Sequence, residues 1–461
     1  MTKDLTTGSP MRLILGFTIP TLFGMLFQQF YNLVDTMIVG QLLGSRALAA
    51  VGATGSINFL VIGFCMGLCG GFVIPVAQRM GAGDHSQMRR YVANAAWLSG
   101  LFSVVLAAAT SMLCRQILTL MHTPADIFEQ SYHYILVIFI GIPSVFLYNL
   151  LAGVIRSLGD SKTPVYFLAL SSGLNILLDF IFILCFHTGV AGAAIATVLS
   201  QTLSGMACLL YMCKKYPILR MTREERQLDK RSCKVLCAMG IPMGLQYSIT
   251  AIGSIVLQSA VNTLGSTYVA AVAAGSKLYQ LIACPFDAMG AAMATYCGQN
   301  VGAWKLDRLG QGVRSCALLG LIYSVLALGA MLLFAPACAM LFLNPGEAEL
   351  ELLRNLTCQY IITMSAFFFP LSLVNIVRFS IQGMGFSTFA ILAGVLEMGA
   401  RTVMGQIFVP MLGYTAACFA SPAAWISADL FLIPACIARI AHLRRGGHDN
   451  LALPAPAGAG Q

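Results

Sequence analysis

The sequence contains little charge for its length. Of its 461 residues only 10% are Asp, Glu, Lys or Arg, 58% are hydrophobic, and the mean hydropathy is +0.80. A soluble domain of this size with so few charged side chains would have too little polar surface to cover its core. The composition therefore argues against a soluble protein and predicts a polytopic helical membrane protein.

Motifs of common enzyme classes and of metal or disulfide frameworks are also missing. The chain contains no HExxH, GxSxG or Walker A sequence, which argues against metalloprotease, α/β-hydrolase serine chemistry and ATP drive. Its 15 cysteines are scattered without a CxxC pair or a histidine cluster, and many lie in apolar segments, where small packing residues are common. We therefore predict a protein that is not an enzyme and has no cofactor. No clear cleavage site follows the first apolar segment, and further spans come after it, so no signal peptide is predicted.

Apolar runs of about 20 residues predict about twelve transmembrane helices. The predicted spans lie near residues 12–39, 50–76, 91–113, 131–154, 164–186, 190–212, 235–259, 268–297, 312–335, 355–378, 388–410 and 414–440. With this map, 22 of the 27 basic residues fall on the side that holds both termini, and the other side receives only Arg46, Arg115 and Arg354. Lys277 and Arg401 stay inside spans. By the positive-inside rule both termini are cytoplasmic, so the net charge of +9 reports topology and no nucleic-acid partner is predicted.

An internal repeat divides the chain into two units of six spans. Gln78 with Gly81-Ala82 recurs 221 residues later as Gln299 with Gly302-Ala303. Further pairs are Ile19-Pro20 with Ile241-Pro242, and Tyr134, Asn149, Gly159 and Ser161 with Tyr360, Asn375, Gly385 and Ser387. Units with an even number of spans begin on the same side, which predicts pseudo-symmetry about the membrane normal, as alternating-access transporters use. The predicted parts are an N-terminal lobe (1–212), a cytoplasmic linker (213–234), a C-terminal lobe (235–445) and a disordered tail (446–461).

Acidic residues inside the predicted spans indicate a functional site. Gln28, Tyr31, Asn32 and Asp35 share one face of the first span, because they are spaced i, i+3, i+4, i+7. A charge inside the bilayer costs about 2.5–3.5 kcal/mol, so an intramembrane carboxylate indicates function. With the helical rise, Asp35, Asp179 and Thr197 all lie roughly 8–11 Å below the outer surface, and Asn175 lies one turn below Asp179. This set suits a partly dehydrated Na⁺ or a shared proton. The alternative for any single buried acid is a structural hydrogen bond.

Of the other polar residues inside the spans, some are predicted to be functional and others structural. Asp287 on the eighth span is the predicted functional acid of the C-terminal lobe, facing either substrate or a partner such as Arg401. The predicted substrate-cavity residues are Gln28, Tyr31, Asn32 and Asp287. Glu397 and Arg401, spaced i, i+4, are interpreted as a self-neutralising pair, and Asp429 is left open. Pro20 removes a backbone hydrogen bond from the first span, which fits either a hinge or a static kink.

Several motifs together resemble one transporter family. They are Ile19-Pro20, the Tyr31–Asp35 run, Gln78 with Gly81-Ala82, Arg156-Ser157-Leu158-Gly159-Asp160, Asn175–Asp179 and Gly298–Ala303. This pattern resembles the multidrug and toxic compound extrusion (MATE) family, nearest its DinF-like branch. The resemblance implies a V-shaped, twelve-helix exporter of the MOP superfamily in the bacterial plasma (inner) membrane. Such an exporter uses inward H⁺ or Na⁺ to expel amphipathic, often cationic, small molecules, and we expect it to act as a monomer in the lipid bilayer.

The resemblance also assigns roles to residues of this sequence. It places the ion site at Asp35, Asn175, Asp179 and Thr197, with Gln28 and Tyr31 as polar neighbours. The acid that a second branch carries on its seventh helix has no match in the span 235–259, which favours coupling through the N-terminal lobe. The alternative is a flippase for a lipid-linked precursor. A flippase would require a large basic cleft, for which the predicted spans contain only Lys277 and Arg401.

Overall fold

The computed structural model describes residues 4–121, 123–343 and 349–447. Within these ranges the regular secondary structure is helical, without strands. The tail predicted to be disordered, 446–461, lies outside the described residues from residue 448 onward.

The helices follow the predicted spans closely. The first half contains α1 (Pro10–Leu43), α2 (Ser45–Phe72), α3 (Ile74–Gly81), α4 (His85–Met112), α5 (Cys114–Leu120), α6 (Phe128–Ile140), α7 (Ile142–Ser157), α8 (Thr163–Phe180), the π-helix η1 (Ile181–Cys185) and α9 (Val190–Lys215). After a short 3₁₀ helix, η2 (Pro217–Leu219), the second half contains α10 (Lys230–Asn262), α11 (Ser266–Gly302), α12 (Asp307–Met340), α13 (Leu350–Ala366), α14 (Phe368–Gly383), α15 (Thr388–Val403), the π-helix η3 (Met404–Phe408), α16 (Val409–Leu412) and α17 (Tyr414–Arg444).

The number of spans agrees with the prediction. Ten helical segments of the described chain are long and apolar enough to cross a membrane, and two bent pairs raise the number to twelve. The bends are 45° between α6 and α7 and 50° between α13 and α14. Pro143 and Pro370 lie in the first turns of α7 and α14, where a proline cannot continue the hydrogen-bond ladder of the preceding helix. The predicted fold class, an all-α integral membrane protein of two six-helix lobes, is confirmed.

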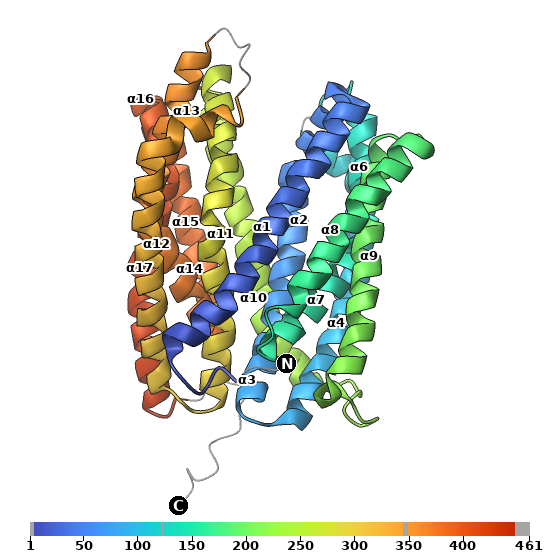
Figure 1. Cartoon of the computed structure of the whole chain (residues 1–461), viewed down its shortest axis with the longest axis vertical. Coiled ribbons are helices and arrows are strands. Elements are labelled where there is room, and N and C mark those ends of the chain that lie inside the picture. Colours follow the sequence, from blue (N-terminus) through green and yellow to red (C-terminus); the bar gives the residue numbers. More distant parts are fainter. Residues whose placement is uncertain (1–3, 122, 344–348, 448–461) are drawn as a thin grey trace, which may run out of the picture.

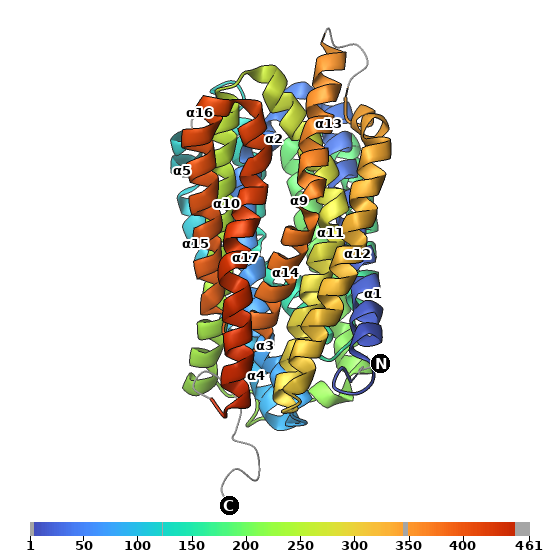
Figure 2. The ribbon, with the colours of Figure 1, turned by 90° about the vertical axis from the view of Figure 1, so that its left-hand side faces the viewer.

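The helices form two bundles, which we call the N-lobe (α1–α9) and the C-lobe (α10–α17). The bundles lie close together at the end where α1 begins and α17 ends, and they diverge toward the opposite end (Figure 1). Figure 2 also shows the start of α1 and the end of α17 at the same end of the molecule. We call the end where α1 begins and α17 ends the terminal end. Each lobe has its own apolar core, centred on residues such as Phe72 and Phe139 in the N-lobe and Phe286 and Phe368 in the C-lobe.

The first helix of each lobe also contacts the other lobe. In α1, Ile14 and Phe17 belong to the C-lobe core, whereas Ile38 and Val39 belong to the N-lobe core. Accordingly, α1 packs against both α11 and α8 and crosses from one bundle to the other in Figure 1. The corresponding helix α10 packs against both α2 and α15. A movement of α1 or α10 therefore affects both lobes.

Candidate functional site

The structure brings the predicted ion-site residues together from three helices. Asp35 lies on α1, Asn175 and Asp179 on α8, and Thr197 on α9, and these three helices pack against one another. The Asn175 side-chain amide donates to Thr197 Oγ1 at 3.2 Å. Tyr31, one turn from Asp35, donates to the same oxygen at 3.5 Å. Thr197 therefore joins α1, α8 and α9 at one point.

Local sequence positions these side chains. A Cβ atom at Gly24 of α1 would lie 3.1 Å from Val165 of α8, so a glycine allows these helices to approach closely. Asn175 and Asp179 are one turn apart on α8 and are both fully buried. Directly after them the helix widens into the π-helix η1, a distortion that is frequent at functional sites.

The site is rich in oxygen atoms that lack hydrogen-bond donors. Asp35 and Asp179 lie close enough for their carboxyl groups to interact directly. Among the described residues, no donor reaches Asp35 Oδ1, Asn175 Oδ1 or either carboxylate oxygen of Asp179. Ionised carboxylates only accept hydrogen bonds, so two that face each other need a proton or a cation between them. As ligands, two carboxylates with amide and hydroxyl oxygens suit a hard monovalent cation or a shared proton.

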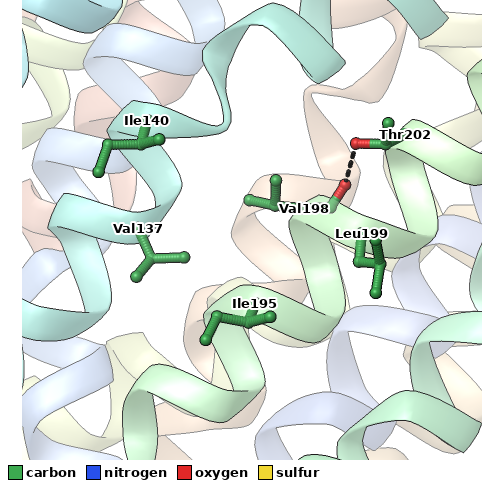
Figure 3. A pocket seen from close by; sticks show the side chains of 6 residues that line it. All are labelled: Val137, Ile140, Ile195, Val198, Leu199 and Thr202. Carbon is green, nitrogen blue, oxygen red and sulfur yellow. Dashed lines mark hydrogen bonds between the residues drawn. The ribbon is translucent and has the colours of Figure 1, made fainter.

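No richer metal site is found in the described part of the chain. It contains no group of three or more His, Cys, Asp or Glu side chains arranged to hold a metal ion. An apolar pocket between α6 and α9, shown in Figure 3, has no charged residue in its lining and offers a cation no ligand set. The lining residues are Val137, Ile140, Ile195, Val198, Leu199 and Thr202.

The polar stripe of the first helix divides between two environments. Tyr31 and Asp35 point toward α8 and α9, whereas Gln28 and Asn32 are exposed. Pro20 lies inside α1, which remains continuous through it. It separates the part of α1 that packs on the C-lobe core from the part that carries Asp35, which is where a hinge would act.

Tyr134 was not singled out for this site in the sequence. It lies on α6, almost fully buried and within electrostatic range of Asp35, Asp179 and Tyr31. Tyr134 therefore lies near the site on a fourth helix, α6, which packs against α9. The internal repeat could have identified Tyr134, because it is one of the residues that recur in the second half, as Tyr360.

The C-lobe contains a buried charge network that the sequence map described incompletely. Glu397 pairs with Arg401 at 3.5 Å, as the i, i+4 spacing predicts. It also pairs with Arg378 of α14, and all three side chains are at least nine-tenths buried. Asp287, in the middle of α11, is exposed and lies near Asn375 and Arg378. Asp429 is also close to Arg378.

The prediction that Lys277 and Arg401 are the only basic residues inside the lobes was wrong. Arg378 stood at the edge of the predicted span 355–378, but α14 continues to Gly383 and carries it into the interior. Likewise α7 continues to Ser157, which places Arg156 inside its last turn, near Tyr148 and Tyr247. These helices continue into polar sequence, so their apolar runs are shorter than the helices themselves.

The fold and the paired lobes define the class: a two-lobed, multi-pass helical membrane protein with the architecture of a transporter. A family model described as MatE matches residues 20–181 and 242–407, one match in each half. The chain therefore belongs to this family of multidrug efflux transporters, which are not enzymes and need no cofactor.

Individual relatives agree with the family assignment. The chain is 33% identical to a probable multidrug resistance protein, YpnP, of Bacillus subtilis, over 66% of this chain and 68% of the relative. It is 30% identical to YoeA of the same organism, also named a probable multidrug resistance protein, over 72% and 73% of the two chains. A solved MOP superfamily transporter from Pyrococcus furiosus superposes with a TM-score of 0.87 at 23% identity, covering 96% of this chain and 98% of that one. This last likeness concerns the fold alone.

Proposed function

We propose that this protein is a secondary antiporter that exports amphipathic, often cationic, small molecules in exchange for H⁺ or Na⁺. The observation that carries the proposal is the group of donor-free oxygens on Asp35, Asn175 and Asp179. Buried acceptors without donors are costly, so the arrangement favours occupancy by an exchangeable proton or cation. The names of the relatives, multidrug resistance proteins, support the substrate class.

The mechanism follows from the position of Asp35. Its helix contacts both lobes, so a change of charge at Asp35 changes the packing of a helix that they share. Proton or Na⁺ binding in the N-lobe favours one arrangement of α1, and substrate binding favours the other. Exchange requires that the ion and the substrate bind the two arrangements unequally. Both termini are proposed to be cytoplasmic because the basic residues gather at the terminal end.

The alternative, a flippase for a lipid-linked precursor, receives less support from the charge balance. The two additional arginines could suggest a basic interior. However, Arg378 is paired with Glu397, and Asp287 and Asp429 lie near it. The C-lobe cluster thus holds three acids and two arginines, and its net charge offers an anionic headgroup no excess of positive charge.

The test is transport in everted membrane vesicles, with a Na⁺ gradient and a pH gradient imposed separately. We expect wild type to accumulate a cationic dye in response to at least one gradient. Asp35→Asn and Asp179→Asn should each abolish that response while the protein still inserts at wild-type levels. Asp126→Asn, the same substitution at an exposed position between α5 and α6, is the matched control and should transport normally. Normal gradient-driven transport by both site variants would refute the coupling site.

A further inference from the structure

The repeated Gln-x-x-Gly motifs meet at the terminal end. Gln78–Gly81 ends α3 and Gln299–Gly302 ends α11, and these two helix ends pack against each other. A Cβ atom on Gly81 would lie 2.0 Å from the carbonyl oxygen of Gln299, and one on Gly302 would lie 1.8 Å from that of Gln78. Because the obstructing atoms belong to the backbone, this contact between the lobes requires glycine at both positions.

Each of the two glutamine side chains donates an equivalent hydrogen bond to a backbone carbonyl of the opposite lobe. Gln78 donates to the carbonyl of Gly383 in the C-lobe at 3.1 Å, and Gln299 donates to that of Ser157 in the N-lobe at 2.9 Å. The two acceptors are 226 residues apart, the same offset that relates Tyr134 to Tyr360. Each motif thus binds the end of the corresponding helix, α14 or α7, in the opposite lobe. We call this pair of contacts the inner gate.

Among the described residues, a further segment holds Gln299 but not Gln78. The residues before α1, which we call the N-terminal strap (4–8), lie against the end of α11. The backbone N–H of Leu5 donates to Gln299 Oε1 at 3.0 Å, and Asn300 donates back to the Leu5 carbonyl at 3.1 Å. Lys305 donates to the Thr6 carbonyl at 2.8 Å. Leu5 itself is almost completely buried, with 1% of its surface exposed.

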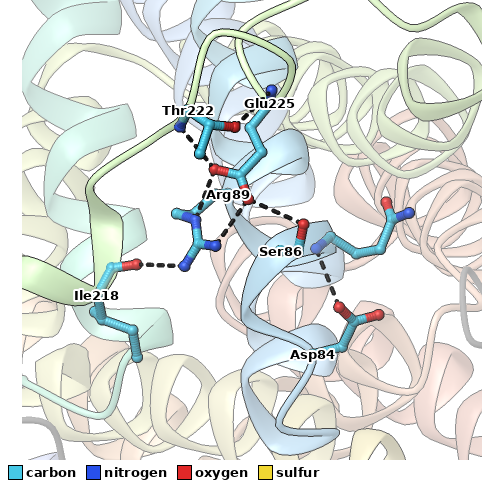
Figure 4. Close-up of polar contacts among 7 residues, drawn as sticks. Asp84, Ser86, Arg89, Ile218, Thr222 and Glu225 are labelled. Carbon is cyan, nitrogen blue, oxygen red and sulfur yellow. Dashed lines mark hydrogen bonds and ion pairs between the residues drawn. The ribbon is translucent and has the colours of Figure 1, made fainter.

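The linker between the lobes binds the N-lobe in a related way but does not reach the gate. Glu225 accepts hydrogen bonds from Ser86 and from two nitrogens of Arg89 near the start of α4, as Figure 4 shows. In the described part of the chain, the linker makes no hydrogen bond to Gln78. The two halves of the gate are therefore unequal: Gln299 is tied to α1 through the strap, whereas no described residue ties Gln78 to α10 in this way.

We propose that the N-terminal strap is a latch that couples α1 to the inner gate. When seated, it orients Gln299 to donate to Ser157 and keeps the lobes closed at the terminal end. When α1 moves in response to the ion at Asp35, the strap leaves Gln299 and the gate opens. This inference uses the alternating access of the proposed function, but it concerns the terminal end, which the ion-site variants leave intact.

The latch can be tested by hydrogen–deuterium exchange of the full-length protein in lipid nanodiscs. Leu5→Lys places a charge where the strap is buried, and Thr7→Lys adds the same charge at an exposed position of the same segment. We expect Leu5→Lys to speed exchange of the amides at the ends of α3 and α11 about tenfold, which equals roughly 1.4 kcal/mol. Thr7→Lys should exchange as wild type does.

A second pair of variants tests the gate without altering the strap. Gly302→Ala should also speed exchange at both helix ends, whereas Gly310→Ala, on the same side of the molecule with open space around it, should not. The unfolding temperature of each variant shows whether the lobes remain folded. Wild-type exchange in folded Leu5→Lys protein would overturn the latch, and wild-type exchange in folded Gly302→Ala protein would overturn the gate.

The outcome is separable from that of the proposed function. If Leu5→Lys opens the gate while Asp35→Asn and Asp179→Asn both still transport, the latch stands and the coupling site fails. If Asp35→Asn abolishes transport while Leu5→Lys leaves exchange unchanged, the coupling site stands and the latch fails.

Discussion

The two lobes arise from one repeated unit, yet their related helices α8 and α15 carry different charged groups. In the N-lobe, α8 carries Asn175 and Asp179 and runs into the π-helix η1. In the C-lobe the related helix α15 carries Glu397 and Arg401 and runs into the π-helix η3. Several oxygens of the N-lobe acids receive no hydrogen bond from any described residue, whereas Glu397 is paired with two arginines.

Under the proposed mechanism, this difference lets the N-lobe exchange an ion while the C-lobe keeps a fixed set of charges. In the C-lobe the guanidinium groups of Arg378 and Arg401 are permanent cations, covalently part of the protein. In the proposed mechanism, the equivalent charge in the N-lobe comes from solution. The proposed coupling to a gradient then requires only one of the lobes, and the absence of a carboxylate from residues 235–259 is consistent with this division.

The largest expected effect is on folding stability in the C-lobe. Glu397→Gln leaves two buried arginines without their carboxylate, and breaking a buried pair in this way costs about 3–5 kcal/mol. Asp179→Asn is the matched acid-to-amide change on the related helix. Since neither oxygen of Asp179 receives a hydrogen bond from a described residue, its loss should change the unfolding free energy by less than about 1 kcal/mol.

The unfolding temperature of each purified variant in detergent tests this difference in stability. We expect a large drop in the unfolding temperature for Glu397→Gln and little change for Asp179→Asn. Equal losses in the two variants would show that Asp179 has structural partners, and the contrast between the lobes would then be wrong.

Much of the site was predictable from the sequence, because helix geometry determines depth. The alternating direction of the spans and the helical rise placed Asp35, Asp179 and Thr197 at one level, and the structure brings their helices together there. The side of the helix that faces inward was harder to predict. Outer faces of membrane helices are as apolar as their cores, so the sequence alone did not separate Tyr31 from the exposed Asn32.

Contacts between the lobes were not predictable. The repeat identified Gln78 and Gln299, but their acceptors, Gly383 and Ser157, depend on how the two lobes are placed. Arg156 and Arg378 were assigned to the wrong environment because each helix continues past the end of its apolar run.

A smaller effect is expected for the neutral oxygen of the ion site. Thr197→Val removes the acceptor of both Asn175 and Tyr31, so the amide oxygen of Asn175 loses its fixed orientation. We expect the ion concentration for half-maximal transport to rise five- to tenfold, which corresponds to roughly 1 kcal/mol for one hydrogen-bonded contact. Thr197→Ser keeps the hydroxyl and should resemble wild type. If the valine and serine variants behave alike, the hydroxyl is not part of the site.

The smallest expected effect concerns the linker, which precedes the C-lobe as the N-terminal strap precedes the N-lobe. Arg89 holds the linker through a bidentate pair with Glu225, at 2.8 Å and 2.7 Å. Hydrogen bonding from Arg89 lowers the pKa of Glu225 to about 2 from an ordinary value of 4.5. A depressed carboxylate pKa gives stability that is fully present above the ordinary value and is lost as the pH falls toward the folded one.

We therefore expect Arg89→Gln to lower the unfolding free energy by about 1 kcal/mol at pH 7. The difference from wild type should shrink below about pH 4.5 and vanish near pH 2, and unfolding temperatures measured across that range test it. Because the linker makes no described hydrogen bond to Gln78, amide exchange at the inner gate should stay unchanged in this variant. If Arg89→Gln opened the gate as Leu5→Lys is expected to do, both segments would act as latches, and the inequality between them would be wrong.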